Sequence, residues 1–263
     1  MTAELPPGGV EITQAAAEAR WAHAWTPAEV AARLAGVPAP WYVAGGWAVD
    51  LFTGGPPRHH GDLEIAVPAA SFPEILSRFR EFAFDVVAHD RLWELTPEVS
   101  GLTHQTWLRD PATGNFLVDV FREPHDGETW IYRRDPSVRL PYTAVVHRTP
   151  DGIPYLAPEL ALLFKAKAVR PKDQQDFARA LPLLDEARRA RLAALVEREH
   201  PGHAWLADLR PGGARPAGGL PAWSDGSDDS GGSGDSAGSD GSGGSGGSGD
   251  SADSARSDGP RRS

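Results

Sequence analysis

The stretch WYVAGGWAVDLFTGGPPRHHGDLEIAV, residues 41–67, decides how this chain folds. It predicts a strand, a glycine turn, a helix, a loop and a second strand. Side chains alternate across a strand, so Asp62 and Glu64 share one face. The apolar residues of the strand then face the core: Leu63, Ile65 and Val67. Acidic pairs are ordinary on exposed strands, but these apolar flanks indicate burial, and a divalent cation commonly explains such a pair.

Two further features strengthen this interpretation. Gly45 and Gly46 lie between strand and helix, where glycine lets a ligand approach the backbone and the helix N-terminus offers free N–H groups. A tight turn that merely needs glycine is the alternative. Asp119 lies within the apolar strand 115–121, where it either joins the acidic pair or pairs with an arginine. Three strand carboxylates beside a glycine turn fit two metal ions that handle a nucleoside triphosphate.

These motifs resemble the DNA-polymerase-β-like nucleotidyltransferase superfamily, and within it the aminoglycoside 2″-adenylyltransferase-like group. The resemblance covers residues 41–184. It implies that Mg²⁺ is held by three carboxylates (Asp62, Glu64 and Asp119), which are also the catalytic residues, and that the triphosphate of ATP or another NTP binds Gly45 and Gly46. A nucleoside monophosphate then passes to a hydroxyl acceptor. Many relatives have Asp where this chain has Glu64, whose extra methylene moves the carboxylate by ~1.5 Å, so the number of metal ions stays open.

Other residues near the motif are candidates for nucleotide binding. Arg58 can bind phosphate in a bidentate manner, and the backbone N–H of Trp47 follows the glycine turn directly. Lys165 lies in a stretch that resembles the lysine-containing segment after the catalytic domain of several nucleotidyltransferases, where it would face the β- and γ-phosphates. The neighbouring His59 and His60 are interpreted as exposed loop residues.

Some polar and aromatic residues are assigned structural roles. Asp173 and Asp176 lie three positions apart on one helix face. They either orient the lysine and the loops or belong to a solvated helix face with local ion pairs, and the second, structural interpretation is preferred. The tryptophans of the central region are interpreted as core residues without a stacking role: Trp47, Trp93, Trp107 and Trp130.

The order of elements predicts an α+β fold: a nucleotidyltransferase-type mixed β-sheet flanked by helices, followed by a small helical C-terminal domain and a disordered tail. Thr26 and Ser71 are predicted helix N-caps, each followed by Pro and then Glu. Strands are expected at 82–87, 92–95, 104–109 and 115–121, with a hairpin about Asp151 and Gly152. The expected units are an N-terminal arm and helix (1–25), a catalytic domain (26–157), a helical domain (158–210) and a Gly/Ser/Asp-rich tail (211–263).

Composition narrows the class of protein. The chain has 263 residues, no cysteine and a formal net charge of −10. From Ser224 onward eight Asp and three Arg contribute a net charge of −5, so half of the net negative charge of the chain lies in the tail. The absence of a basic patch makes nucleic acid an unexpected partner. No secretory signal or membrane span is predicted, and a cytoplasmic location is expected. The oligomeric state is left open.

The sequence leaves three functions to be compared. The first is a Mg²⁺-dependent nucleotidyltransferase that moves AMP from ATP onto a small hydroxylated acceptor such as an aminoglycoside-like antibiotic, which implies antibiotic resistance. The second is an antitoxin-paired type of nucleotidyltransferase that acts on RNA or protein. The third is a nucleotide-binding regulatory protein without turnover, which the intact set of acids disfavours.

Overall fold

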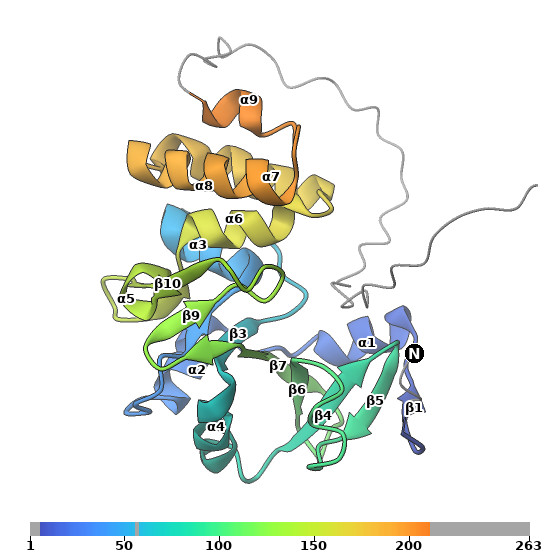
Figure 1. Cartoon of the computed structure of the whole chain (residues 1–263). Helices are drawn as coiled ribbons and strands as arrows, with labels where there is room; N and C mark the ends of the chain where they lie inside the picture. The colour runs from blue at the N-terminus through green and yellow to red at the C-terminus, as the bar shows by residue number, and fades with distance from the viewer. Residues whose placement is uncertain (1–5, 56–57, 211–263) are drawn as a thin grey trace, which may run out of the picture.

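The computed structural model describes residues 6–55 and 58–210, and these form two β-sheets with the C-terminal helices stacked on one side (Figure 1). Within the described part, a nine-stranded sheet has the order β1-β5-β4-β6-β7-β3-β2-β12-β11, and a three-stranded sheet has the order β10-β9-β8. The strands of the large sheet are β1 (Val10–Glu11), β2 (Tyr42–Val43), β3 (Glu64–Pro68), β4 (Ala83–Ala88), β5 (Arg91–Glu94), β6 (Gln105–Arg109), β7 (Phe116–Glu123), β11 (Val146–Arg148) and β12 (Pro154–Leu156). Those of the small sheet are β8 (His125–Asp126), β9 (Thr129–Ile131) and β10 (Arg139–Pro141).

The large sheet is mixed. Strand β3 runs parallel to β7, and β2 runs parallel to β12, whereas the other pairs are antiparallel. The helices are α1 (Gln14–Trp21), α2 (Pro27–Arg33), α3 (Gly45–Thr53), α4 (Phe72–Arg78), α5 (Tyr142–Val145), α6 (Pro158–Ala166), α7 (Pro171–Ala180), α8 (Glu186–Glu199) and α9 (Leu206–Leu209). The predicted α+β class, a mixed sheet flanked by helices, is confirmed.

The predicted N-caps differ in outcome. Thr26 forms a capping box with Glu29, as its sequence indicates. Ser71 does not cap α4, because it ends a 3₁₀ turn at Ala69–Ser71 and its own backbone is already helical (φ −93°, ψ −2°). A side chain caps a helix only when its own backbone is extended, so the Ser71 prediction is wrong.

The expected hairpin about Asp151 and Gly152 is present as β11 and β12. The predicted strands are found within one or two residues as β4, β5, β6 and β7. The helix expected within residues 1–25 is α1, which Thr13 caps, and Val10–Glu11 before it pairs with β5.

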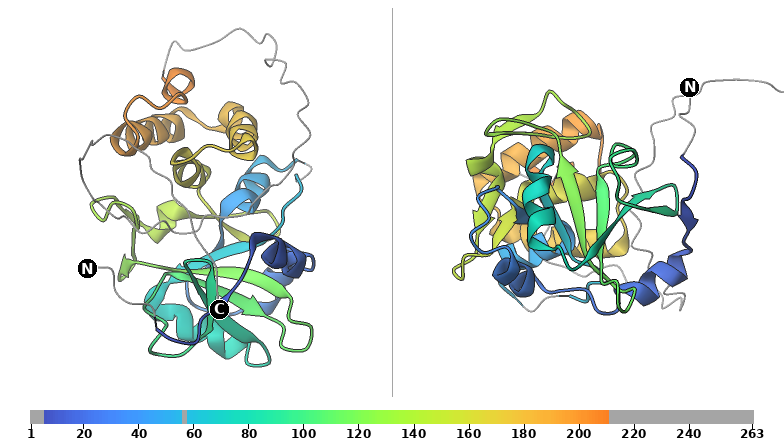
Figure 2. Two further views of the ribbon diagram at one scale, coloured as in Figure 1. Left: turned by 90° about the vertical axis from the view of Figure 1, so that its right-hand side faces the viewer. Right: turned by 90° about the horizontal axis from the view of Figure 1, so that it is seen from below.

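The C-terminal helices stack above the sheet (Figure 2). Helix α6 packs against α3, α7 and α8, and α3 also contacts α7. None of the helices among the described residues combines the length and the apolar character that crossing a bilayer requires. The division into an arm, a catalytic domain and a helical domain stays a prediction, and the tail at 211–263 lies outside the described residues.

Candidate active site

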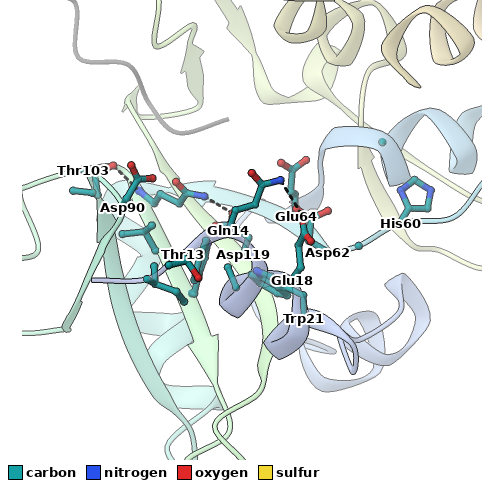
Figure 3. A pocket seen from close by; sticks show the side chains of 18 of the residues that line it. Thr13, Gln14, Glu18, Trp21, His60, Asp62, Glu64, Asp90, Thr103 and Asp119 are labelled. Carbon is teal, nitrogen blue, oxygen red and sulfur yellow. Dashed lines mark hydrogen bonds between the residues drawn. The ribbon is translucent and has the colours of Figure 1, made fainter. Parts of the chain in front are cut away.

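The acidic pair lies where the second strand of the central motif begins. Glu64 is the first residue of β3, and Asp62 comes just before the strand. Both are half-buried, whereas Leu63, Ile65 and Val67 are fully buried, so the predicted alternation of faces is confirmed. Strand β3 is parallel to β7, and their register places Glu64 opposite Asp119. Asp62, Glu64 and Asp119 face one pocket (Figure 3).

Asp119 is the most deeply buried acid of the three, with 3% of its surface exposed. Its Oδ2 accepts a hydrogen bond from Gln105 Nε2 at 2.5 Å. Its Oδ1 has no hydrogen-bond partner among the described residues. Burial, followed by the negative charge of Glu64, raises the pKa of Asp119 well above its usual range. Among the described ion pairs Asp119 has no arginine partner, so the structure does not bear out the arginine alternative.

The three acids offer carboxylate oxygens to a metal ion. In the described part of the chain, no three His, Asp or Glu side chains already form a group that would hold one. Asp119 Oδ1 is nevertheless a buried carboxylate oxygen without a hydrogen-bond donor among the described residues, an arrangement that a bound ion commonly explains. Burial also raises the pKa of Asp62, against the opposing charges of Lys172 and Arg58. The donor set fits a divalent cation, and the assignment of the three ligands stays a prediction.

The glycine turn and the acidic pair interlock. Gly45 has a φ of +59°, and a Cβ built there would lie 1.5 Å from Glu64 Oε2. A Cβ on Gly46 would lie 2.1 Å from Arg58 Nη2 and 2.8 Å from His60 Cε1. Glycine is therefore required at position 45, whereas a side chain at position 46 would displace Arg58 and His60. The Glu64 carboxylate lies beside the N-terminus of α3, where backbone N–H groups and the helix dipole favour negative charge.

The residue after the glycines fixes the loop that leads into β3. The Trp47 ring stacks on His60 with centroids 4.2 Å apart, and its Nε1 donates to the Asp62 carbonyl at 3.1 Å. His60 Nε2 lies 2.5 Å from Asp50 Oδ2, and the His60 side chain is only 4% exposed. The prediction of an exposed His60 is therefore wrong, because its ring packs between the tryptophan and a buried aspartate. His59 is exposed, as expected.

The predicted phosphate-binding residues are held by carboxylates. Arg58 makes a bidentate pair with Asp176, with Nε–Oδ1 at 3.0 Å and Nη2–Oδ2 at 3.1 Å. Lys165 Nζ lies 2.9 Å from Asp173 Oδ1 and 3.1 Å from Asp176 Oδ2. Both aspartates are fully buried, so the preferred interpretation of a solvated helix face is wrong. Their contacts agree with the alternative, in which they orient the lysine and the loop that carries Arg58. Burial lowers the pKa of Lys165, but Asp173 and Asp176 outweigh that effect and raise it.

A cavity of about 1290 Å³ joins these groups. Pockets that bind drug-sized ligands typically measure about 300–1,000 Å³, so this cavity has room for a nucleotide and part of an acceptor. Residues that the sequence did not single out also line it. Arg170 and Lys172 lie near the phosphate candidates, and Gln14, Glu18 and Trp21 come from α1. The two basic residues were adjacent to the lysine motif in sequence, but nothing local in residues 14–21 pointed to the cavity.

Comparisons with known proteins agree with this geometry. Residues 28–99 match the family model described as aminoglycoside-2''-adenylyltransferase, a stretch that includes Gly45, Gly46, Asp62 and Glu64 and ends before Asp119. No curated protein matches the chain.

The chain is also similar in structure to two antibiotic-modifying enzymes. One is the lincosamide antibiotic adenylyltransferase LnuA, lincomycin-bound: 17% identity, TM-score 0.42, covering 57% of this chain and 91% of that one. The other is ANT(2")-Ia in complex with adenylyl-2"-tobramycin: 13% identity, TM-score 0.45, covering 65% of this chain and 95% of that one. With TM-scores below 0.5, these likenesses say nothing about the substrate of this chain. The match over residues 28–99, which contains the glycine turn and the acidic pair, shows that this part of the chain is similar to the aminoglycoside-2''-adenylyltransferase family.

Proposed function

We propose that the protein transfers AMP from ATP to a hydroxyl group of a small, aminoglycoside-like acceptor in a Mg²⁺-dependent reaction, and that antibiotic resistance follows from it. The observation that carries the proposal is the placement of Glu64 opposite Asp119 across two parallel strands, directly against the glycine turn. The name of the matched family supports the nucleotide and the class of acceptor.

The three acids are proposed to hold the metal. Asp62 and Glu64 would supply neighbouring carboxylates, and Asp119 would contribute Oδ1, which lacks a hydrogen-bond partner in the described structure. When bound, Mg²⁺ would neutralise the phosphate oxygens and stabilise the charge that develops during transfer. Gln105 holds the other oxygen of Asp119 and so keeps Oδ1 turned away from it.

The phosphates are proposed to bind on the basic side of the cavity. Arg58, Lys165, Arg170 and Lys172 line this side. Arg58 and Lys165 are held in place by buried aspartates, so less side-chain entropy is lost when phosphate binds. The glycine turn and the backbone N–H of Trp47 at the start of α3 would face the same phosphates.

The reaction then needs one proton acceptor. The acceptor oxygen forms a bond to the α-phosphorus, the bond from that phosphorus to the bridging oxygen breaks, and pyrophosphate leaves with its electron pair. The acceptor hydroxyl must lose its proton. We propose that Asp119 receives it, because burial, followed by the negative charge of Glu64, raises the pKa of this carboxylate and so favours proton uptake.

Pyrophosphate release tests the proposal. The purified protein is incubated with Mg²⁺, each NTP in turn and a panel of aminoglycosides, beside the variant Asp62→Ala. We expect release only with an acceptor present, fastest with ATP, and none from the variant. Tight ATP binding without release for any acceptor would favour a non-catalytic nucleotide-binding protein. Release that requires RNA or a protein would favour the antitoxin-paired type of enzyme.

A further inference from the structure

Asp50 is a buried carboxylate of α3 that the proposed chemistry does not use. The residue is only 4% exposed. Its Oδ2 accepts a hydrogen bond from the Arg58 backbone N–H at 3.1 Å and lies 2.5 Å from His60 Nε2. Because an ionised carboxylate only accepts hydrogen bonds, we assign the ring proton of His60 to Nε2. Asp50 therefore holds two residues of the loop that leads from α3 to β3.

The other oxygen of Asp50 connects α3 with the C-terminal helices. Asp50 Oδ1 pairs with Arg179 Nη1 of α7, and Arg179 Nη2 donates to Thr53 Oγ1 at 3.1 Å. Three positions earlier on α7, Asp176 pairs with the Arg58 guanidinium at 3.0 and 3.1 Å. The backbone of Arg58 is therefore held from α3 and its side chain from α7.

Residues 58, 60 and 62 of this loop are each tied to α3. Asp50 contacts the first two, while Trp47 stacks on the His60 ring and donates to the Asp62 carbonyl. All three loop residues line the cavity, and Figure 3 shows His60 beyond Asp62 at one end of the labelled side chains. Arg58 is proposed to bind phosphate and Asp62 a metal ion, so a shift of the loop would displace both groups together.

We propose that Asp50 and His60 are positioning residues, which hold the loop so that the Arg58 guanidinium and the Asp62 carboxylate face the nucleotide together. The inference rests on the proposed function and assigns no bond-making step to either residue. Partners that orient a ligand-binding side chain typically change affinity or activity by about 10–100-fold when they are lost. A displacement of about 1 Å caused by a distant substitution can cost about 100-fold in rate.

Nucleotide binding reports on the loop without requiring turnover. The full-length protein is titrated calorimetrically, in Mg²⁺, with the ATP analogue that carries a methylene group between the α- and β-phosphorus, which the transfer reaction cannot cleave. Asp50→Asn has one acceptor oxygen in place of two, and His60→Phe keeps a ring against Trp47 but has no N–H. Asp85→Asn is the matched control, because Asp85 is also 4% exposed and paired with an arginine but does not line the cavity.

The variants are compared at a temperature where circular dichroism shows each to be folded. Asp50→Asn and His60→Phe should each weaken binding about tenfold, whereas Asp85→Asn should bind as wild type does. His60→Gln, whose amide N–H can still donate to Asp50, should lose less than His60→Phe. The double variant Asp50→Asn with His60→Phe should also lose about tenfold, because both residues act through one contact. Should Asp50→Asn fail to fold, the two His60 variants decide the inference.

Three results overturn the inference: unchanged affinity in folded Asp50→Asn or His60→Phe, an equal loss in Asp85→Asn, or no binding by wild type. Losses that multiply in the double variant would also overturn it, because His60 would then contact the nucleotide independently of Asp50. The same proteins are assayed for pyrophosphate release from ATP with the aminoglycoside panel. Binding that depends on Asp50 and His60 without any release would support the positioning role and contradict the proposed function. Release with unchanged kcat and KM in both variants would do the reverse.

Discussion

Gly45 and Glu64 approach so closely that a Cβ built on Gly45 would lie 1.5 Å from Glu64 Oε2. The glycine of the turn and the second acid of the strand are therefore one structural unit, although nineteen positions separate them in the chain. A side chain at position 45 must displace a carboxylate that we propose to be catalytic.

A pair of glycine substitutions separates this contact from backbone strain. Gly45 and Gly54 have φ of +59° and +64°, but in the described structure a Cβ on Gly54 would meet nothing within 4 Å. Alanine at either position should cost about 1–2 kcal/mol of stability, because both backbones are left-handed. Only Gly45→Ala should abolish pyrophosphate release. Equal activity of the two variants at a temperature where both are folded would contradict the interlocked arrangement.

Asp119→Asn should lower the activity without lowering the stability of the protein. The substitution removes a buried charge whose ionisation is opposed by burial and by Glu64, and it keeps an oxygen that can accept from Gln105. We expect an unchanged or higher Tm and a turnover reduced by about 100-fold or more, as when a group that stabilises charge in the transition state is lost. A thermal melt and the pyrophosphate assay measure both. Unchanged activity would exclude Asp119 from the catalytic residues.

The ion pair between Arg58 and Asp176 should matter for nucleotide binding beyond its effect on stability. Asp176→Asn leaves Arg58 and Lys165 without one carboxylate each, and loss of one partner of a buried pair costs about 3–5 kcal/mol. Asp85→Asn is a matched control, because Asp85 makes a similar bidentate pair with Arg109 at 2.6 and 3.1 Å, and neither residue lines the cavity. Urea unfolding should show a loss in both variants, and KM for ATP should rise only in Asp176→Asn. A parallel rise in KM for both would show that the effect is one of general stability.

His104 should make stability depend on pH. Burial, and then the charges of Arg133 and Arg122, lowers the pKa of His104 from 6.5 to about 3. Its Nε2 lies 2.9 Å from Arg133 Nη1, which suits a neutral ring that accepts a hydrogen bond. Between about pH 6.5 and pH 3 the unfolded chain binds a proton that the folded chain does not, so stability falls as the pH falls through this window.

The variant His104→Gln tests this window. Its amide oxygen can still accept from Arg133, but the side chain does not titrate. The Tm of wild type should fall more steeply than that of the variant as the pH decreases from 7 to 4. Parallel curves of Tm against pH would show that the pKa of His104 is the same in the folded and the unfolded chain, and would contradict the prediction.

Much of the fold could be predicted from the sequence, because the residue pattern of the central motif specifies a strand, a glycine turn, a helix, a loop and a second strand. The acids alternate with Leu63, Ile65 and Val67, so the acids must lie on one face of the strand and the apolar residues on the other. In the structure the three apolar residues are fully buried, as this alternation predicts. The Ser71 prediction failed because the sequence pattern of an N-cap does not reveal that the preceding residues already form a 3₁₀ turn. The edge strand β1 and the three strands of the small sheet, β8 to β10, are each two or three residues long. Strands this short show no alternation of apolar and polar residues from which they could be predicted.

The candidate site was predictable where it is local and not where it is assembled from distant segments. Asp62, Glu64 and the glycines lie within one short stretch, and their spacing indicates their relation. The burial of His60 depends on Asp50 and Trp47, on the other side of the loop. The place of α1 at the cavity depends on the pairing of β1 with the distant β5, which no local pattern specifies.

The most direct test of the central claim is the mass of the acceptor after reaction. Each aminoglycoside of the panel is incubated with ATP, Mg²⁺ and the full-length protein, and the products are separated by liquid chromatography and weighed by mass spectrometry. We predict that wild type converts at least one aminoglycoside to a species that carries one AMP, and that Asp62→Asn and Asp119→Asn do not. Formation of the same product by both variants at the wild-type rate would contradict the assignment of these acids to the transfer of the nucleotide.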